Sequence, residues 1–137
     1  MTISQQEIIK RLDNFRQASH ENHLPVTPQK LEIFRIIASS ALHPQAQEIH
    51  ELVKKKFENI SLATVYKNLI GFKELGLIAE LPLCGIPNRY DAKLETHCHV
   101  VDTKNGKVYD LGENCNLNLP QIIMGKTIKK TDIVYYV

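Results

Sequence analysis

The sequence predicts an α+β protein built from two parts in series. Apolar residues recur at helical spacing up to about residue 76, and beyond it short β-branched runs alternate with turn residues. A chain of 137 residues is enough for one ordinary domain or for two very small ones. We therefore expect a helical N-terminal domain over residues 1–91 and a small α/β domain over residues 92–137.

The first two helices are predicted from an apolar stripe and from the residues that begin and end each of them. Residues 3–18 carry the first stripe, and a polar segment ending at Pro25 follows it. Thr27 followed by Pro28 is typical of an N-cap and a first helical position, so the second helix is expected to begin at Pro28. Ser39-Ser40 is expected to end it.

The third and fourth helices carry comparable signals. His43-Pro44 is expected to open the third helix, and the lysines at 54–56 suit the negative end of its dipole. Ser61 is a typical N-cap for the fourth helix, and Gly76 a typical C-terminal stop.

The rest of the chain is predicted to be mostly strands. Expected strands lie at 77–83, 88–91, 97–102, 106–111 and 128–137, with one short helix at 120–124. Asn105-Gly106 is a strong hairpin turn signal. Short helices followed by a β-hairpin follow the order of a winged helix. The last part is too small to be stable alone, which favours completion by a twofold copy of itself.

Composition excludes several classes of protein. Lysine and arginine total 17 against 15 acidic residues, so no strong basic excess indicates a non-specific grip on phosphate. No run is long and apolar enough for a membrane span, and the N-terminus does not resemble a signal peptide, so we expect a soluble cytoplasmic protein. Cys84, Cys98 and Cys115 are odd in number and show no CxxC spacing, which predicts reduced thiols rather than a disulfide framework.

One predicted hairpin carries candidate metal ligands. His97 and His99 are two residues apart, so on a strand they share a face and Cys98 points to the other. Asp110 lies on the partner strand and supplies a carboxylate if the register places it opposite the pair.

Two further ligand-type residues lie earlier in the chain. Asp91 stands at the expected hinge between the two parts, and His43 stands just before the third helix. A mixed set of imidazoles and carboxylates suits Fe²⁺, Mn²⁺ or Zn²⁺. An ion held by both parts would couple metal binding to a conformational change.

The fourth predicted helix has a polar face opposite its apolar stripe. Its members are Ser61, Thr64, Lys67 and Asn68, with Tyr66 at the margin. Side chains of this kind suit a helix that enters the DNA major groove, and they equally suit an ordinary solvated face.

Several strings in order resemble the ferric-uptake-regulator (Fur) family of bacterial metal-dependent repressors. They are Val26-Thr27-Pro28-Gln29-Lys30, His43-Pro44, Ser61-Leu62-Ala63-Thr64-Val65-Tyr66-Lys67-Asn68-Leu69, Asn88-Arg89-Tyr90-Asp91, His97-x-His99 and Gly106-Lys107-Val108-Tyr109-Asp110. The resemblance implies a homodimer whose subunits each combine a winged-helix DNA-binding domain with an α/β dimerisation domain. It also implies an inverted-repeat operator in double-stranded DNA and no membrane partner.

The resemblance places the family's regulatory metal site on five residues. They are His43, Asp91, His97, His99 and Asp110. The two aspartates are similar to the peroxide-sensing branch, whereas iron-sensing relatives tend to carry glutamate there. In that branch Fe²⁺ or Mn²⁺ closes the dimer onto DNA, and peroxide at bound Fe²⁺ oxidises a ligand histidine. His43 and His97 match the oxidised positions.

The sequence also departs from the family pattern. Residues 102–105 stand where many relatives carry a CxxC pair, so no structural Cys₄ zinc is expected. Pro25 stands where relatives often carry a basic residue aimed at the minor groove, so either Lys30 or His23 replaces that residue or the contact is lost. Of the helix-face residues, Tyr66 is expected to contact a base and Lys67 a phosphate or guanine, with Ser61 and Thr64 positioning the helix.

Three functions compete at this point. The first is a peroxide-responsive, Fe²⁺/Mn²⁺-dependent repressor, and the second is an iron, manganese or zinc availability sensor of the same family. The third is a small metallohydrolase, for which Glu95 is the sole candidate base near the ligands. We do not expect an enzyme.

Overall fold

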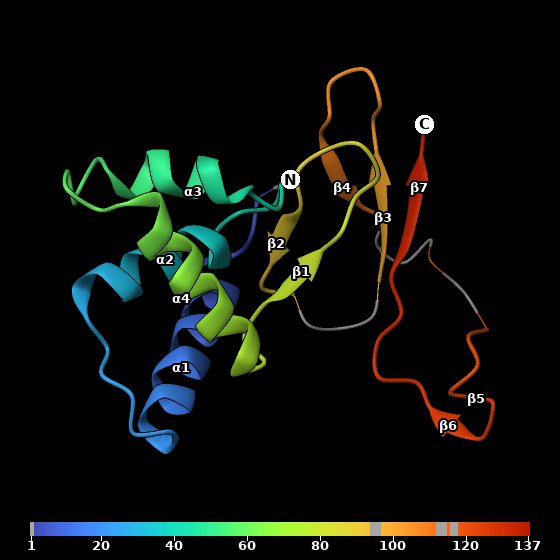
Figure 1. Cartoon of the computed structure of the whole chain (residues 1–137), viewed down its shortest axis with the longest axis horizontal. Coiled ribbons are helices and arrows are strands. Elements are labelled where there is room, and N and C mark those ends of the chain that lie inside the picture. The colour runs from blue at the N-terminus through green and yellow to red at the C-terminus, as the bar shows by residue number, and fades with distance from the viewer. Residues whose placement is uncertain (1, 94–96, 112–114, 116–117) are drawn as a thin grey trace. The chain divides into compact units, whose positions relative to one another are not determined.

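The chain forms two compact units in the computed structural model, Met1–Leu94 and Glu95–Val137. The structure describes residues 2–93, 97–111, 115 and 118–137. Figure 1 shows a helical first unit with one β-hairpin and a second unit made of strands.

The first unit contains four helices that begin at well-formed caps. They are α1 (Gln5–Glu21), α2 (Pro28–Ala38), α3 (Ala46–Val53) and α4 (Leu62–Glu74). The Thr27 side chain accepts from the Lys30 N–H at the start of α2, and the Ser61 side chain accepts from the Thr64 N–H at the start of α4. Both predicted starts are confirmed.

The start of α3 differs from the sequence prediction. His43-Pro44 does not open the helix, because His43 has a φ of 50° and so lies in the left-handed region. Gln45 is the N-cap instead, and it forms a capping box with Glu48. His43 therefore belongs to the turn before α3, not to the helix.

Three phenylalanines form the centre of the first unit's core. Phe15 of α1 stacks on Phe34 of α2 with ring centroids 4.8 Å apart, and Phe72 of α4 meets both rings edge-on at 5.5 and 5.4 Å. All three side chains are buried. Edge-to-face and stacked aromatic pairs stabilise a core beyond their buried area, so this cluster holds α1, α2 and α4 together.

A short antiparallel hairpin completes the first unit. It pairs β1 (Ala79–Leu81) with β2 (Arg89–Asp91). The strands are shorter than predicted because Pro82 and Pro87 flank the turn and cannot donate to the ladder. The Tyr90 N–H donates to the Pro44 carbonyl at 3.1 Å, which fixes β2 to the turn before α3.

The second unit is a three-stranded sheet with the order β4-β3-β7. Its strands are β3 (Cys98–Val101), β4 (Val108–Asp110) and β7 (Ile133–Tyr136). β3 pairs antiparallel with β4 and parallel with β7. Gly106 has a φ of 71° in the predicted turn, and its N–H donates to the Asp102 carbonyl at 2.8 Å.

The predicted helix at 120–124 is wrong. A small hairpin stands there instead, formed by β5 (Ile122–Ile123) and β6 (Lys126–Thr127). Met124 and Gly125 link the strands and have φ values of 55° and 72°, which is typical of a two-residue hairpin turn and incompatible with a helix.

The prediction of reduced thiols is also wrong for two of the three cysteines. Cys98 and Cys115 form a disulfide, with Cα atoms 5.7 Å apart, while Cys84 is exposed in the first unit. Cys98 points away from its histidine neighbours, as predicted. Cys115 lies beyond β4 and reaches Cys98 from there. The spacing of the cysteines in the sequence does not indicate that these two residues come together.

Candidate metal centre

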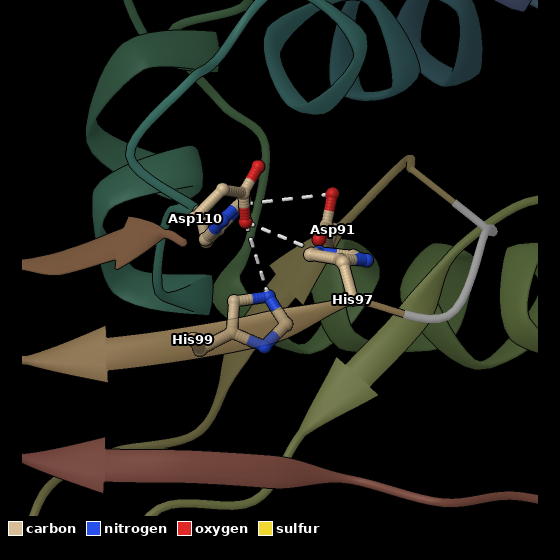
Figure 2. Close-up of side chains that lie close together, drawn as sticks. Asp91, His97, His99 and Asp110 are labelled. Carbon is tan, nitrogen blue, oxygen red and sulfur yellow. Dashed lines mark ion pairs between the residues drawn. The ribbon is translucent and has the colours of Figure 1, made fainter. Parts of the chain in front are cut away.

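Two imidazoles converge on one carboxylate oxygen in the second unit. The Nε2 atoms of His97 and His99 lie 3.1 and 3.3 Å from Oδ1 of Asp110. Figure 2 shows these side chains directed toward one another from β3, from the residue just before it and from the end of β4. Both histidine side chains are less than 10% exposed, and that of Asp110 is 23% exposed.

Strand geometry explains this convergence. Side chains two residues apart on a strand share a face, and the His97 and His99 rings lie 4.3 Å apart between centroids. The β3–β4 register pairs His99 directly with Asp110. Cys98 lies between the two histidines and points the other way, into the disulfide.

The donors in this cluster fit a divalent metal ion. Their ligand atoms lie within 4.8 Å of one another, so one ion is within reach of all three. Two imidazoles and one carboxylate form the kind of set that binds Fe²⁺ and related ions. We refer to His97, His99 and Asp110 as the hairpin cluster.

The first unit holds a second pair of ligand-type residues. His43 Nδ1 lies 3.5 Å from Asp91 Oδ1, and both side chains are buried. Asp91 Oδ1 also accepts a hydrogen bond from the Lys93 N–H at 2.8 Å. Asp91 is the last residue of β2, and His43 lies in the turn that β2 holds, so the same hydrogen bonds position both side chains.

Arg89 is a supporting residue that sequence reasoning missed. It is buried, and its Nη1 donates to the His43 carbonyl at 3.2 Å while lying 3.8 Å from the Glu48 carboxylate. It therefore holds His43 in its left-handed turn. The single sequence signal for this role is the position of the arginine beside Tyr90 in a predicted strand. A buried cation is uncommon at such a position.

On the predicted DNA-binding face of α4, some side chains are exposed as expected and one is not. Tyr66 is 46% exposed, and Lys67 is exposed beside it. Ser61 caps the helix and hydrogen-bonds the half-buried Thr64 side chain at 2.9 Å. Asn68 was expected on the polar face, but it is only 9% exposed and its amide donates to the Thr64 carbonyl, so the exposed-face prediction is wrong for Asn68.

Glu80 connects α4 to the β1–β2 hairpin. Its carboxylate accepts from Lys73 at 2.9 Å, from Tyr90 at 3.2 Å and from Asn88 at 3.3 Å. The hydrogen bond from Lys73 lowers the pKa of Glu80, whereas burial raises the pKa of Tyr90. An ionised Glu80 thus holds the hairpin against the C-terminal end of α4.

Lys30 lies half-buried in the first turn of α2, where its backbone N–H is bonded to the Thr27 side chain. Glu95, the candidate base of a hydrolase, lies outside the described residues. Among the residues that the structure describes, no helix is long and apolar enough to cross a membrane.

A helical unit ending in a β-hairpin, joined to a small sheet that carries imidazole and carboxylate donors, defines the architecture of a metal-responsive transcription regulator. The model of the ferric uptake regulator family matches residues 21–136 of this chain. The chain belongs to that family. Its fold is α+β, a winged-helix unit followed by a small sheet, and solved ferric uptake regulators of Helicobacter pylori and Vibrio cholerae share this fold. Regulators of this family bind DNA as dimers.

Individual relatives include both peroxide and metal regulators. The chain is 34% identical over 110 residues to the peroxide-responsive repressor PerR of Staphylococcus saprophyticus, covering 80% of this chain and 74% of the relative. It superposes on the Campylobacter jejuni peroxide stress regulator with a TM-score of 0.65 and 28% identity, covering 92% and 93% of the two chains. A zinc-bound manganese uptake regulator gives a TM-score of 0.67 at 25% identity, covering 90% and 97%.

Proposed function

We propose that this protein is a peroxide-responsive, Fe²⁺/Mn²⁺-dependent transcriptional repressor that acts as a homodimer on an inverted-repeat operator. The observation that carries the proposal is the convergence of two imidazoles on the Asp110 carboxylate. The similarity to a peroxide-responsive repressor over 80% of the chain supports it.

The proposed ligand set joins the hairpin cluster to His43 and Asp91. Imidazole nitrogens and carboxylate oxygens together suit Fe²⁺ or Mn²⁺. Because His43 and Asp91 belong to the first unit and the hairpin cluster to the second, one ion shared by both would fix the angle between the units. No structural Cys₄ zinc is part of this proposal, since the sequence contains no CxxC pair.

The DNA contacts are assigned to α4. Tyr66 and Lys67 are exposed on one side of the helix, where an aromatic ring can reach a thymine methyl and an ammonium a phosphate or guanine. Ser61 and Thr64 position the helix start, and the buried Asn68 amide stiffens the next turn. Lys30, at the start of α2, would contact the flanking groove or backbone. In a dimer, two α4 helices about 34–36 Å apart would match an inverted repeat.

Peroxide sensing is assigned to His43 and His97. An Fe²⁺ ion held by these ligands would activate peroxide beside them, and the imidazole itself would supply the two electrons for its own oxidation. The net change is one oxygen gained by an imidazole and one water released from each peroxide. An oxidised imidazole is a poorer ligand, so the two units are no longer held together and the α4 helices lose their operator spacing.

Mass spectrometry of the protein loaded anaerobically with Fe²⁺ and given a small dose of peroxide tests this proposal. We expect one added oxygen on His43 or His97 with Fe²⁺ and none with Mn²⁺. Peptide fragmentation must locate the oxygen, because methionine and cysteine also oxidise. Oxygen on sulfur alone would contradict peroxide sensing by histidine.

A metal-availability sensor is the second candidate function. The similarity to a zinc-bound manganese uptake regulator favours it. Titration of Fe²⁺, Mn²⁺ and Zn²⁺ against operator binding separates the two functions. A sensor responds to metal concentration and not to peroxide, whereas the proposed repressor releases DNA when peroxide meets the Fe²⁺ form.

A further inference from the structure

The disulfide closes a loop of the chain that contains two of the three residues of the hairpin cluster. It joins Cys98, at the start of β3, to Cys115, beyond the end of β4, with a sequence separation of 17. His99 and Asp110 lie inside the closed loop, and His97 directly precedes it. The covalent link is therefore attached to the same end of the hairpin as the candidate metal ligands.

We propose that Cys98 and Cys115 form a reversible dithiol–disulfide modification site that locks the β3–β4 hairpin. The disulfide state holds the hairpin cluster in its convergent arrangement, and the dithiol state loosens it. A further consequence, which rests on the proposed function, is that reduction weakens metal binding.

The two sulfurs differ in their access to an oxidant. Cys98 is fully buried, whereas Cys115 is partly exposed. Hydrogen peroxide would therefore meet Cys115 first, where the thiol becomes a sulfenic acid and one water leaves. The Cys98 thiol then attacks that sulfur, forming the S–S bond and releasing a second water. In total two thiols lose two electrons and two protons to one peroxide. A small-molecule thiol reverses the change by exchange.

The locking effect follows from the small size of the second unit. Units of this size rarely bury enough apolar surface to be stable alone, and disulfides commonly compensate. In the parts of this unit that the structure describes, the fully buried apolar side chains are Cys98, Val101 and Val108. The Leu111 N–H donates to the Cys98 carbonyl at 3.0 Å, one residue beyond Asp110. Reducing the disulfide removes the covalent link beside this hydrogen bond. The end of the hairpin that carries the candidate metal ligands is then free to move.

Peptide mapping tests whether the pair is a modification site. The full chain with Cys84→Ser is reduced, loaded with Mn²⁺, treated with peroxide and then alkylated. We expect a peptide pair linked through Cys98 and Cys115 that disappears when dithiothreitol is added. Both thiols alkylated after peroxide treatment, or oxidation only to unlinked sulfinic acids, would overturn the proposal.

Hydrogen exchange tests the lock without any metal. The amides of Val100, Val101 and Val108 should exchange faster in the reduced protein than in the oxidised one, and α2 amides serve as the internal control. Cys115→Ser, at a partly exposed position, should match the reduced protein and show no response to oxidants. Cys98→Ala is a second variant with the same expectation. Equal exchange of the hairpin amides in both states would overturn the lock.

Mn²⁺ binding then tests the consequence for the metal. We expect reduction to weaken the affinity of the Cys84→Ser protein by roughly tenfold, less than the full effect of closing such a loop, and to leave Cys115→Ser unchanged. If the protein binds no Mn²⁺ in either state, the proposed function is contradicted. The hydrogen-exchange measurement on the metal-free protein would still show whether the disulfide locks the hairpin. Equal Mn²⁺ affinity in both states would overturn the link between disulfide and metal.

Discussion

His99 and Asp110 are direct partners across the β3–β4 ladder, and the Nε2 atom of His99 lies 3.3 Å from Oδ1 of Asp110. His97 reaches the same oxygen from two residues earlier, at 3.1 Å. One carboxylate oxygen therefore faces two imidazoles, and the register of a single strand pair places His99 opposite Asp110, with His97 in the residue just before β3. A change in that register would separate them together.

Removing the central imidazole should abolish tight metal binding. His99→Ala leaves the hairpin cluster with one carboxylate and one imidazole, so Mn²⁺ affinity should fall by about 100-fold or more, since even outer partners of metal ligands are worth about 10–100-fold. Calorimetric titration measures the effect. His20→Ala, at the exposed end of α1, is the matched control and should bind Mn²⁺ like the unmodified chain.

Lengthening the carboxylate should separate metal binding from peroxide sensing. Asp110→Glu keeps the carboxylate, so metal-dependent operator binding should persist, but the extra methylene shifts the oxygens relative to His97 and His99. We expect slower DNA release after peroxide treatment of the Fe²⁺ form, measured by fluorescence anisotropy. Asp132→Glu, in the same unit, is the control. Release as fast as in the unmodified chain would contradict assignment to the peroxide-sensing branch.

The α4 lysine should contribute an electrostatic contact to DNA. Lys67→Ala should weaken operator binding and make the salt dependence of binding shallower by about one unit of logarithmic slope. The same substitution at Lys10, exposed on α1, is the control. Anisotropy titrations over a range of salt concentrations give both slopes, and an unchanged slope for Lys67→Ala would place this lysine away from DNA.

The buried Glu32 carboxylate should make stability depend on pH. Hydrogen bonds from Arg35 and then Lys56 lower its pKa below 4.5. A carboxyl group with a lowered folded-state pKa stabilises the fold above its unfolded pKa and loses this effect as the pH falls through the folded pKa. Glu32→Gln should therefore destabilise the protein at neutral pH. Because both cations are about half exposed to screening solvent, the cost should be about 1 kcal/mol.

Urea unfolding at neutral pH and at successively lower pH checks this prediction, because the advantage of the native carboxylate is lost as the pH falls through its lowered folded-state pKa. Glu51→Gln, on the exposed side of α3, should differ little from the unmodified chain at either pH. A Glu32→Gln deficit that persists unchanged at low pH would show that charge is not its cause.

The helices were predictable where a local signal decides the structure. Thr27 and Ser61 cap helices because their side chains accept backbone N–H groups within three residues, and this chemistry is visible in the sequence. His43-Pro44 was misread because the left-handed turn at His43 depends on a hydrogen bond from Arg89, 46 residues away. A proline after an apolar segment could not reveal that partner.

The part of the candidate site that depends on the two-residue repeat of a strand was predictable from the sequence. The shared face of His97 and His99 follows from their spacing, and the Asn-Gly turn signal favours a hairpin that brings Asp110 across. The disulfide was missed because an odd number of cysteines says nothing about which two meet. Asn68 was misplaced because a four-residue hydrogen bond back to Thr64 draws its side chain onto the helix.

The parallel pairing of β7 with β3 has a consequence for synthesis on the ribosome. The helices of the first unit close over short sequence distances and can form early, but β3 pairs in register with Ile133–Tyr136, more than 30 residues downstream. β3, which follows His97 and carries His99, therefore gains one of its two neighbours only after Ile133–Tyr136 has left the exit tunnel. During that interval one edge of β3 is unpaired and open to nascent neighbours and chaperones, so the strand that carries the candidate metal ligands is completed later than the helices of the first unit.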